Sequence, residues 1–200
     1  VQLLSPVRTG DGAEVTGAVG RSVTFHLQNL DGSAAAWSFH DDVIAAVDFG
    51  DPPRVTFFDD AYKSRFAFSE NGSVLTISQL RTSDAGTYTA KISGVKTTFT
   101  LRVFRELVMP TVICAAQNCS AGGCRYTLSC TAPGSGYGNV SYGWRVGNSL
   151  WIEGPTVLVE ELPLEELLLP LTCTAQNPVS SRNVTVTSAA AACAGKTVGG

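Results

Sequence analysis

The distribution of cysteine along the chain constrains its fold more than any other sequence feature. All six cysteines of the 200-residue chain lie between Cys114 and Cys193, so a half without cysteine precedes a half that is rich in it. An even number of cysteines is typical of disulfides formed in an oxidising compartment. Four glycosylation sequons favour the same compartment, and they lie at Asn71, Asn118, Asn139 and Asn183. The sequence therefore predicts an extracellular, N-glycosylated protein with room for two domains of about 100 residues each.

Composition excludes several classes of protein. Charged residues make up 16% of the chain and hydrophobic residues 44%, which is incompatible with a disordered, highly charged chain. The net charge is −3 and there is no block of Lys or Arg, so no nucleic-acid partner is expected. The longest apolar runs are far shorter than the ~20 residues of a membrane-spanning helix. We expect that a membrane anchor either lies outside this chain or does not exist.

The sequence contains none of the common catalytic motifs that we considered. His26 and His40 are the only imidazoles, and neither has the spacing of a metal site. The chain lacks a nucleophile elbow, a phosphate-binding glycine loop and a dinucleotide fingerprint. We interpret the adjacent carboxylates as solvated turns; these are Asp41 with Asp42, Asp59 with Asp60, and Glu165 with Glu166. The sequence predicts a protein that is not an enzyme, with no catalytic residues, metal, cofactor or small-molecule substrate.

Hydrophobic periodicity predicts an all-β fold. Short alternating runs, bounded by Gly, Asp, Asn and Pro, recur about every ten residues, which is the spacing of a β-sandwich. In the first half the expected strands are 21–28, 34–40, 43–49, 63–69, 73–79, 87–93 and 96–104.

The segment 75–88 carries the strongest local signal in the first half. It resembles the stretch of immunoglobulin variable-type domains that leads from strand E into strand F. In that resemblance Tyr88 is the tyrosine-corner residue, Asp84 pairs with Arg65, and Trp37 is the buried tryptophan of strand C.

The first half departs from the immunoglobulin pattern at its disulfide. Leu27 and Ala90 occupy the two positions where the cysteines that join the sheets normally stand. The resemblance therefore implies a variable-type domain over residues 1–105 whose structural core is made by Leu27, Trp37, Tyr88 and Ala90, without an intersheet disulfide.

The second half repeats the immunoglobulin pattern with its cysteines present. Cys130 and Cys173 flank Trp144, and this order is the signature of an immunoglobulin core. The short interval between the cysteines suits a constant-type domain, which we expect over residues 106–195. Residues 196–200 are interpreted as a stalk or an added tail. The predicted fold class is thus all-β, with two immunoglobulin-like sandwiches in tandem, variable-type and then constant-type.

The combination of these two domains resembles the signalling lymphocytic activation molecule (SLAM) family. The local matches are 99–107, 124–130, 140–144 and 171–181, and together they cover most of the chain. Membership would imply a cell-surface immune receptor that mediates adhesion and signalling on the extracellular side of the plasma membrane. Its partner would be a second copy or another SLAM-family receptor on an opposing cell. Two alternatives stay open: a secreted or virus-encoded decoy for a host SLAM-family receptor, and an adhesion protein without a signalling role.

Disulfide pairing is not determined by the residues alone, because six cysteines permit 15 pairings. The family pattern implies Cys130–Cys173 across the sheets and Cys124–Cys193 between strands B and G. That leaves Cys114 with Cys119.

Family resemblance also implies where a partner binds, on the exposed face of the front sheet of the first domain. Strand alternation places small and weakly charged residues on that face. The parity of strand 43–49 is left open, so Ile44 and Val47 either join the face or pack inward. His40 is either a solvated strand end or a contact residue. The predicted contact residues are Ala36, Ser38, His40, Ile44, Val47, Thr89, Lys91, Lys96, Thr98 and Thr100.

Overall fold

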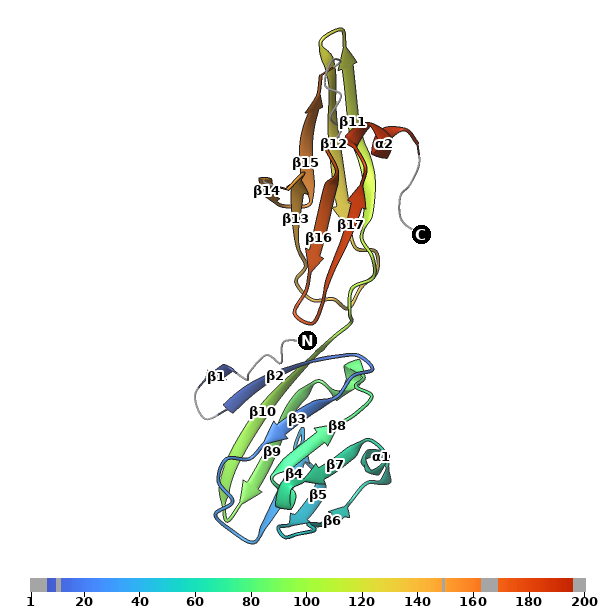
Figure 1. The fold of residues 1–200 in the computed structure, drawn as a ribbon. Helices are drawn as coiled ribbons and strands as arrows, with labels where there is room; N and C mark the ends of the chain where they lie inside the picture. Colours follow the sequence, from blue (N-terminus) through green and yellow to red (C-terminus); the bar gives the residue numbers. More distant parts are fainter. Residues whose placement is uncertain (1–6, 10–11, 149, 163–168, 196–200) are drawn as a thin grey trace. The chain divides into compact units, whose positions relative to one another are not determined.

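The computed structural model describes residues 7–9, 12–148, 150–162 and 169–195. The chain divides into two compact units, Val1–Phe104 and Arg105–Gly200. Strands make up nearly all of the regular structure in both units, which confirms the predicted all-β fold class (Figure 1). The expected turn at Glu165 and Glu166 and the expected tail at 196–200 lie outside the described residues.

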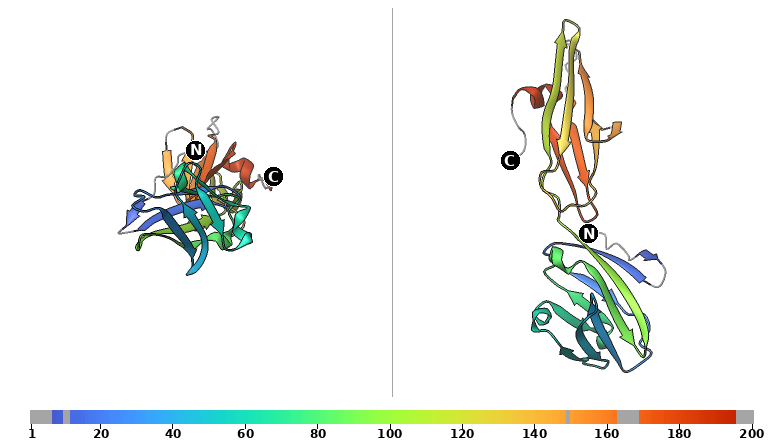
Figure 2. Two further views of the ribbon diagram at one scale, coloured as in Figure 1. Left: turned by 90° about the horizontal axis from the view of Figure 1, so that it is seen from below. Right: turned by 180° about the vertical axis from the view of Figure 1, so that it is seen from behind.

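A seven-stranded and a three-stranded sheet form the first unit (Figures 1 and 2). The larger sheet has the order β1-β2-β10-β9-β4-β5-β6. Its strands are β1 (Val7–Thr9), β2 (Gly12–Ala18), β4 (Ala34–Phe39), β5 (Asp42–Asp48), β6 (Arg54–Phe57), β9 (Gly86–Ile92) and β10 (Val95–Phe104). The smaller sheet has the order β3-β8-β7, with β3 (Val23–His26), β7 (Phe66–Ser69) and β8 (Val74–Ile77). Short helical turns α1 (Asp60–Lys63), η1 (Glu70–Gly72) and η2 (Thr82–Asp84) connect the strands.

Strand alternation missed β1, β2 and β6. The β2 segment is rich in glycine and alanine, so it lacks the large side chains that make alternation visible. Its position comes from a parallel pairing with β10, in which Ala13 lies opposite Phe99 and Val15 opposite Leu101. This long-range pairing has no local sequence signal.

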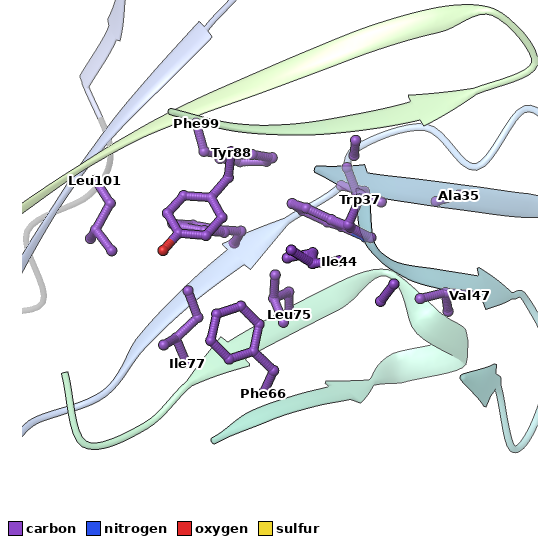
Figure 3. Packing of buried hydrophobic residues seen from close by; sticks show 14 of the residues in the cluster. Ala35, Trp37, Ile44, Val47, Phe66, Leu75, Ile77, Tyr88, Phe99 and Leu101 are labelled. Atoms are coloured by element: carbon purple, nitrogen blue, oxygen red, sulfur yellow. The ribbon is translucent and has the colours of Figure 1, made fainter. Parts of the chain in front are cut away.

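Aromatic packing fills the space between the two sheets of the first unit (Figure 3). Trp37, Tyr88 and Ala90 are fully buried and Leu27 is 8% exposed, so the predicted core residues lie in the core. Ala90 lies directly opposite Trp37 in the β4–β9 register, and its small side chain leaves room for the indole. The ring of Phe25 stacks on Phe99 at 4.8 Å between centroids. Burial of these large side chains holds the sheets together without a disulfide.

The second unit is a sandwich of a four-stranded and a three-stranded sheet. The four-stranded sheet has the order β14-β13-β16-β17, with β13 (Ser141–Val146), β14 (Leu150–Glu153), β16 (Leu171–Gln176) and β17 (Ser181–Val186). The other sheet has the order β11-β12-β15, with β11 (Thr111–Ser120), β12 (Gly123–Thr131) and β15 (Thr156–Glu161). Trp144 is fully buried between them beside the Cys130–Cys173 disulfide, as the resemblance implies.

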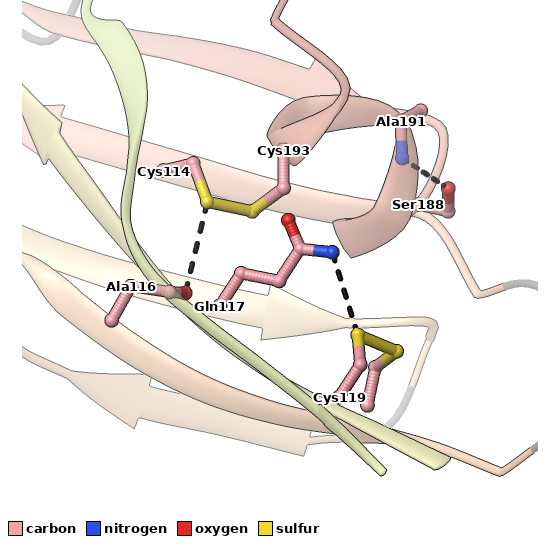
Figure 4. Close-up of a disulfide and its surroundings, with 8 residues drawn as sticks. Cys114, Ala116, Gln117, Cys119, Ser188, Ala191 and Cys193 are labelled. Carbon is pink, nitrogen blue, oxygen red and sulfur yellow. Dashed lines mark hydrogen bonds between the residues drawn. A yellow bond between two sulfur atoms is a disulfide. The ribbon is translucent and has the colours of Figure 1, made fainter. Parts of the chain in front are cut away.

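The other two disulfides differ from the implied pairing. The structure joins Cys114 to Cys193 (Figure 4), and it joins Cys119 to Cys124. Cys114 and Cys119 both lie on β11, and five residues of extended chain separate their backbones by about 16 Å, too far for a disulfide. Cys119 instead faces Cys124 across the β11–β12 hairpin, and Cys193 reaches Cys114 from the short helix α2 (Ala189–Cys193). The implied Cys114–Cys119 and Cys124–Cys193 pairs are therefore wrong.

Removing the hairpin disulfide tests this pairing. The double variant Cys119→Ser/Cys124→Ser should lower the free energy of unfolding of the second unit by about 2 kcal/mol, because the bond closes only a short loop. Hydrogen exchange of peptides from β12 and β16 measures the loss. A thiol count on the denatured variant provides the control: Cys114 and Cys193 should remain bonded, and two free thiols would contradict the pairing.

Candidate functional site

The outward side of β10, β9, β4 and β5 is the candidate binding site, and we call it the outer face. Ala35 and Trp37 of β4 are buried, so Ala36 and Ser38 between and after them point outward. Ala36 lies opposite Lys91 and Ser38 opposite Thr89. The outer face comprises Ala36, Ser38, Val43, Ala46, Thr89, Lys91, Lys96, Thr98 and Thr100.

Two predicted contact residues of β5 are core residues instead. Ile44 is 1% exposed and Val47 is fully buried, and both point into the aromatic core (Figure 3). Trp37 pairs with Ala45 and Ser38 with Val43, so Ile44 is an extra residue in a β-bulge. The bulge turns Ile44 and Ala45 to the same side, so simple alternation does not hold along β5, whose parity the sequence left open. Val43, which is 53% exposed, and Ala46 take their place on the outer face.

His40, another predicted contact residue, lies outside the outer face. Strand β4 ends at Phe39, and His40 and Asp41 form a tight turn in which both have positive φ. The imidazole lies against the Phe39 ring, with 4.0 Å between centroids, and a β-carbon added at Gly86 would collide with its Nε2. His40 is therefore a turn residue that covers Phe39.

Small and hydroxyl side chains occupy the centre of the outer face. One row across the strands runs from Ala46 through Ala36 and Lys91 to Lys96, and the next runs from Val43 through Ser38 and Thr89 to Thr98. The lysines lie directly opposite each other on β9 and β10, and neither is in an ion pair described for the chain. Two like charges so placed favour an acidic partner group between them.

An ion pair beneath the tyrosine corner braces the strand that carries Thr89 and Lys91. Arg65 binds Asp84 through two hydrogen bonds, Nη1 to Oδ2 at 2.7 Å and Nη2 to Oδ1 at 2.8 Å, as the resemblance implies. The hydroxyl of Tyr88 donates to the carbonyl of Asp84 at 2.6 Å. Burial raises the pKa of the Asp84 carboxyl, but the hydrogen bonds from Arg65 and the Arg81 amide outweigh it and hold the pKa below its usual value.

All four sequons lie outside the outer face. Asn71 is exposed in η1, between the β7 and β8 strands of the three-stranded sheet. Asn118, Asn139 and Asn183 are exposed residues of the second unit. A carbohydrate on any of these residues therefore does not originate on the outer face.

Within the described ranges, histidine, cysteine and carboxylate side chains form no cluster of metal ligands. The same ranges contain no helix with the length and hydropathy needed to cross a membrane.

Comparison with known proteins agrees with the geometry. Two sandwiches in tandem, the first with a tyrosine corner and no disulfide, define an immunoglobulin-like protein of two domains. The chain is 32% identical to human SLAM family member 5 over 181 residues, which covers 84% of the chain and 51% of that protein. It is 29% identical to the mouse protein of the same name over 189 residues, or 90% of the chain and 56% of the relative. Human T-lymphocyte surface antigen Ly-9 is 31% identical over 184 residues, 84% of the chain and 28% of its own length. The chain belongs to the SLAM family.

Solved structures support the fold. The CD2-binding domain of CD58 has a TM-score of 0.60 at 20% identity, covering 87% of this chain and 95% of that one. Murine CEACAM1b also has a TM-score of 0.60, at 18% identity, covering 86% of this chain and 94% of that one. No protein-family model matches the chain. The chain spans about half the length of the SLAM family member 5 proteins.

Proposed function

We propose that this chain is the extracellular part of an immune-cell surface receptor that mediates adhesion and signalling. In this proposal the outer face binds a second copy of the chain or another SLAM-family receptor on an opposing cell. Membership of the SLAM family supports the class of receptor, and the CD58 fragment with the same fold is itself described as a CD2-binding domain.

The small side chains at the centre of the outer face are the main observation that supports the proposal. Alanine, serine and threonine line its centre, so a second sheet can approach closely without large side chains in between. Val43 contributes exposed apolar surface, and Lys91 with Lys96 provides a cationic rim. Asp48, exposed on β5 at the other side, provides an opposite charge. A two-fold arrangement of two such faces brings unlike charges together.

A face of this kind predicts weak and reversible binding. Standard interfaces bury about 800 Å² on each partner, and a polar interface of that size need not be tight. Sedimentation of the glycosylated ectodomain over a concentration series should therefore show self-association in the micromolar range. A strict monomer would direct the search to other SLAM-family ectodomains, and absence of binding to any of them would contradict the proposal.

Charge reversal at Lys91 tests the placement of the site. Lys91→Glu should weaken binding about tenfold, because it removes a rim cation that attracts an acidic partner group. Lys63→Glu makes the same change on α1, outside the outer face, and should leave affinity unchanged. Equal affinities of the two variants, measured by sedimentation or surface plasmon resonance, would move the site to another surface.

A further inference from the structure

The four-stranded sheet of the second unit carries an aromatic side chain on its solvent side. Trp151 of β14 is 49% exposed, whereas Trp37 and Trp144 are fully buried. Its indole reaches over the neighbouring strand β13 and lies on Gly143, where an added β-carbon would collide with Cζ2. Because Gly143 has no side chain, the ring can pack directly on the backbone of β13. The ring atoms nearest that position are Cζ2, Cη2 and Cε2, which all belong to the benzene half of the indole.

Polar groups surround this indole in a shallow hollow of about 480 Å³. Ser141 and Thr174 contribute hydroxyls, Glu153 a carboxylate and Gln176 an amide. An aromatic surface bordered by hydroxyl, amide and carboxylate groups matches the chemistry of a sugar, which has an apolar ring face and a polar rim. The hollow is therefore suited to a carbohydrate.

A glycosylation sequon lies on the same side of this sheet. Asn183 of β17 is directly opposite Thr174 of β16, and Thr174 is directly opposite Gly143 of β13. Directly opposed residues point to the same side of a sheet, so Asn183, Thr174 and the indole over Gly143 share one surface. Two strand spacings separate the backbones of Asn183 and Gly143, about 10 Å. The first two sugars of an N-glycan span that distance.

We propose that the glycan on Asn183 folds back across Thr174 and packs its first sugars on the indole of Trp151. In forming the linkage, Nδ2 of Asn183 bonds to C1 of N-acetylglucosamine, loses a proton, and displaces the pyrophosphate of a lipid-linked oligosaccharide donor. The sugar then covers the hydrophobic surface that Trp151 exposes. This inference rests on the extracellular location in the proposed function.

The neighbouring sequon provides a matched comparison. Asn139 lies four residues before Gly143, which is about 13 Å along an extended chain. It is not in the row of opposed residues that connects Asn183 through Thr174 to Gly143. A glycan there begins at the end of β13 rather than beside the ring. Asn139→Gln therefore removes one glycan from the same unit without removing the proposed cover.

Fluorescence quenching isolates the tryptophan in question, because Trp151 is the only one of the three that solvent reaches. Protein secreted from mammalian cells should carry a glycan on Asn183 by mass spectrometry. In Asn183→Gln, acrylamide should quench the exposed fluorescence with a Stern–Volmer constant about twice that of the wild type, because one ring face becomes open. Thr185→Val, which removes the sequon and keeps Asn183, should behave the same, and Asn139→Gln should match the wild type.

Three results would overturn the inference: an unmodified Asn183, equal quenching in Asn183→Gln and the wild type, or an increase in Asn139→Gln alone. Equal quenching would mean that the glycan on Asn183 does not shield the indole of Trp151. Self-association through the first unit should be the same in all these variants. If the variants and the wild type are quenched equally while self-association stays intact, only the glycan cover is refuted. If the quenching difference is present but the ectodomain binds neither itself nor another family member, only the proposed function is refuted.

Discussion

Replacing Ala36 by arginine should weaken binding by about 100-fold, the largest effect expected for any single change on the outer face. Ala36 lies in the middle of the row that runs from Ala46 to Lys96. A guanidinium there is buried against a similar face, with Ala46 and Lys91 rather than a carboxylate directly opposite it, and an unpaired buried charge costs about 3 kcal/mol. The added side chain also keeps the two sheets apart. The affinity is measured for the second copy or for the family member that binds the wild type.

A matched control separates this effect from unfolding. Thr24→Arg places the same charge on β3, an exposed position of the three-stranded sheet in the same unit. It should leave affinity unchanged, and both variants should keep the hydrogen-exchange protection of β9. Wild-type affinity in Ala36→Arg would exclude the outer face as the site.

Substitution of Asp84 by alanine should lower the free energy of unfolding of the first unit by about 3 to 5 kcal/mol. The Arg65 and Asp84 side chains are 9% and 7% exposed, so removing the carboxylate leaves a buried guanidinium without its partner. The Arg81 amide loses its acceptor as well. Hydrogen exchange of peptides from β8 and β9 reports this loss for the first unit alone.

The ion pair between Glu14 and Arg102 in the same unit should contribute less to the free energy of unfolding, because both side chains are exposed. Glu14 and Arg102 are 3.5 Å apart with side chains 47% and 60% exposed. Glu14→Ala should therefore cost less than about 1 kcal/mol. A comparable loss in both variants would contradict the role assigned to the buried pair.

Acid should reproduce the effect of the Asp84 substitution. The pKa of this carboxyl is lower in the folded state than its ordinary value of 3.8, so the folded state favours the ionised form. The resulting stability is present above the unfolded-state pKa and is lost as pH falls through the lower folded-state pKa. The difference in unfolding free energy between the wild type and Asp84→Ala should narrow below about pH 4. A constant difference down to lower pH would show that the carboxylate charge is not responsible.

Sequence patterns predicted the parts of the fold that depend on residues near one another in the chain. The segment 75–88 predicted the corner at Tyr88 because its turn, ion pair and buried ring are all encoded within one short stretch and Arg65. The resemblance to variable-type immunoglobulin domains placed Trp37, Leu27 and Ala90 in the core, because these apolar residues stand where that pattern has its buried tryptophan and its two cysteines. Most of the outer face followed from strand alternation.

Two features were decided only by tertiary structure, and both depend on how segments of the chain pair in space. The bulge at Ile44 adds a residue to β5, so the positions that face the core change without any change in the apolar pattern. The disulfides followed the same rule: Cys119 meets Cys124 because the β11–β12 hairpin sets them opposite, and Cys114 meets Cys193 because α2 brings the chain end back to β11. The sequence by itself determined that the chain has a disulfide-free half and a cross-linked half. Which cysteines bond, and which side of β5 faces solvent, depended on how neighbouring strands and α2 pair in three dimensions, which no local pattern records.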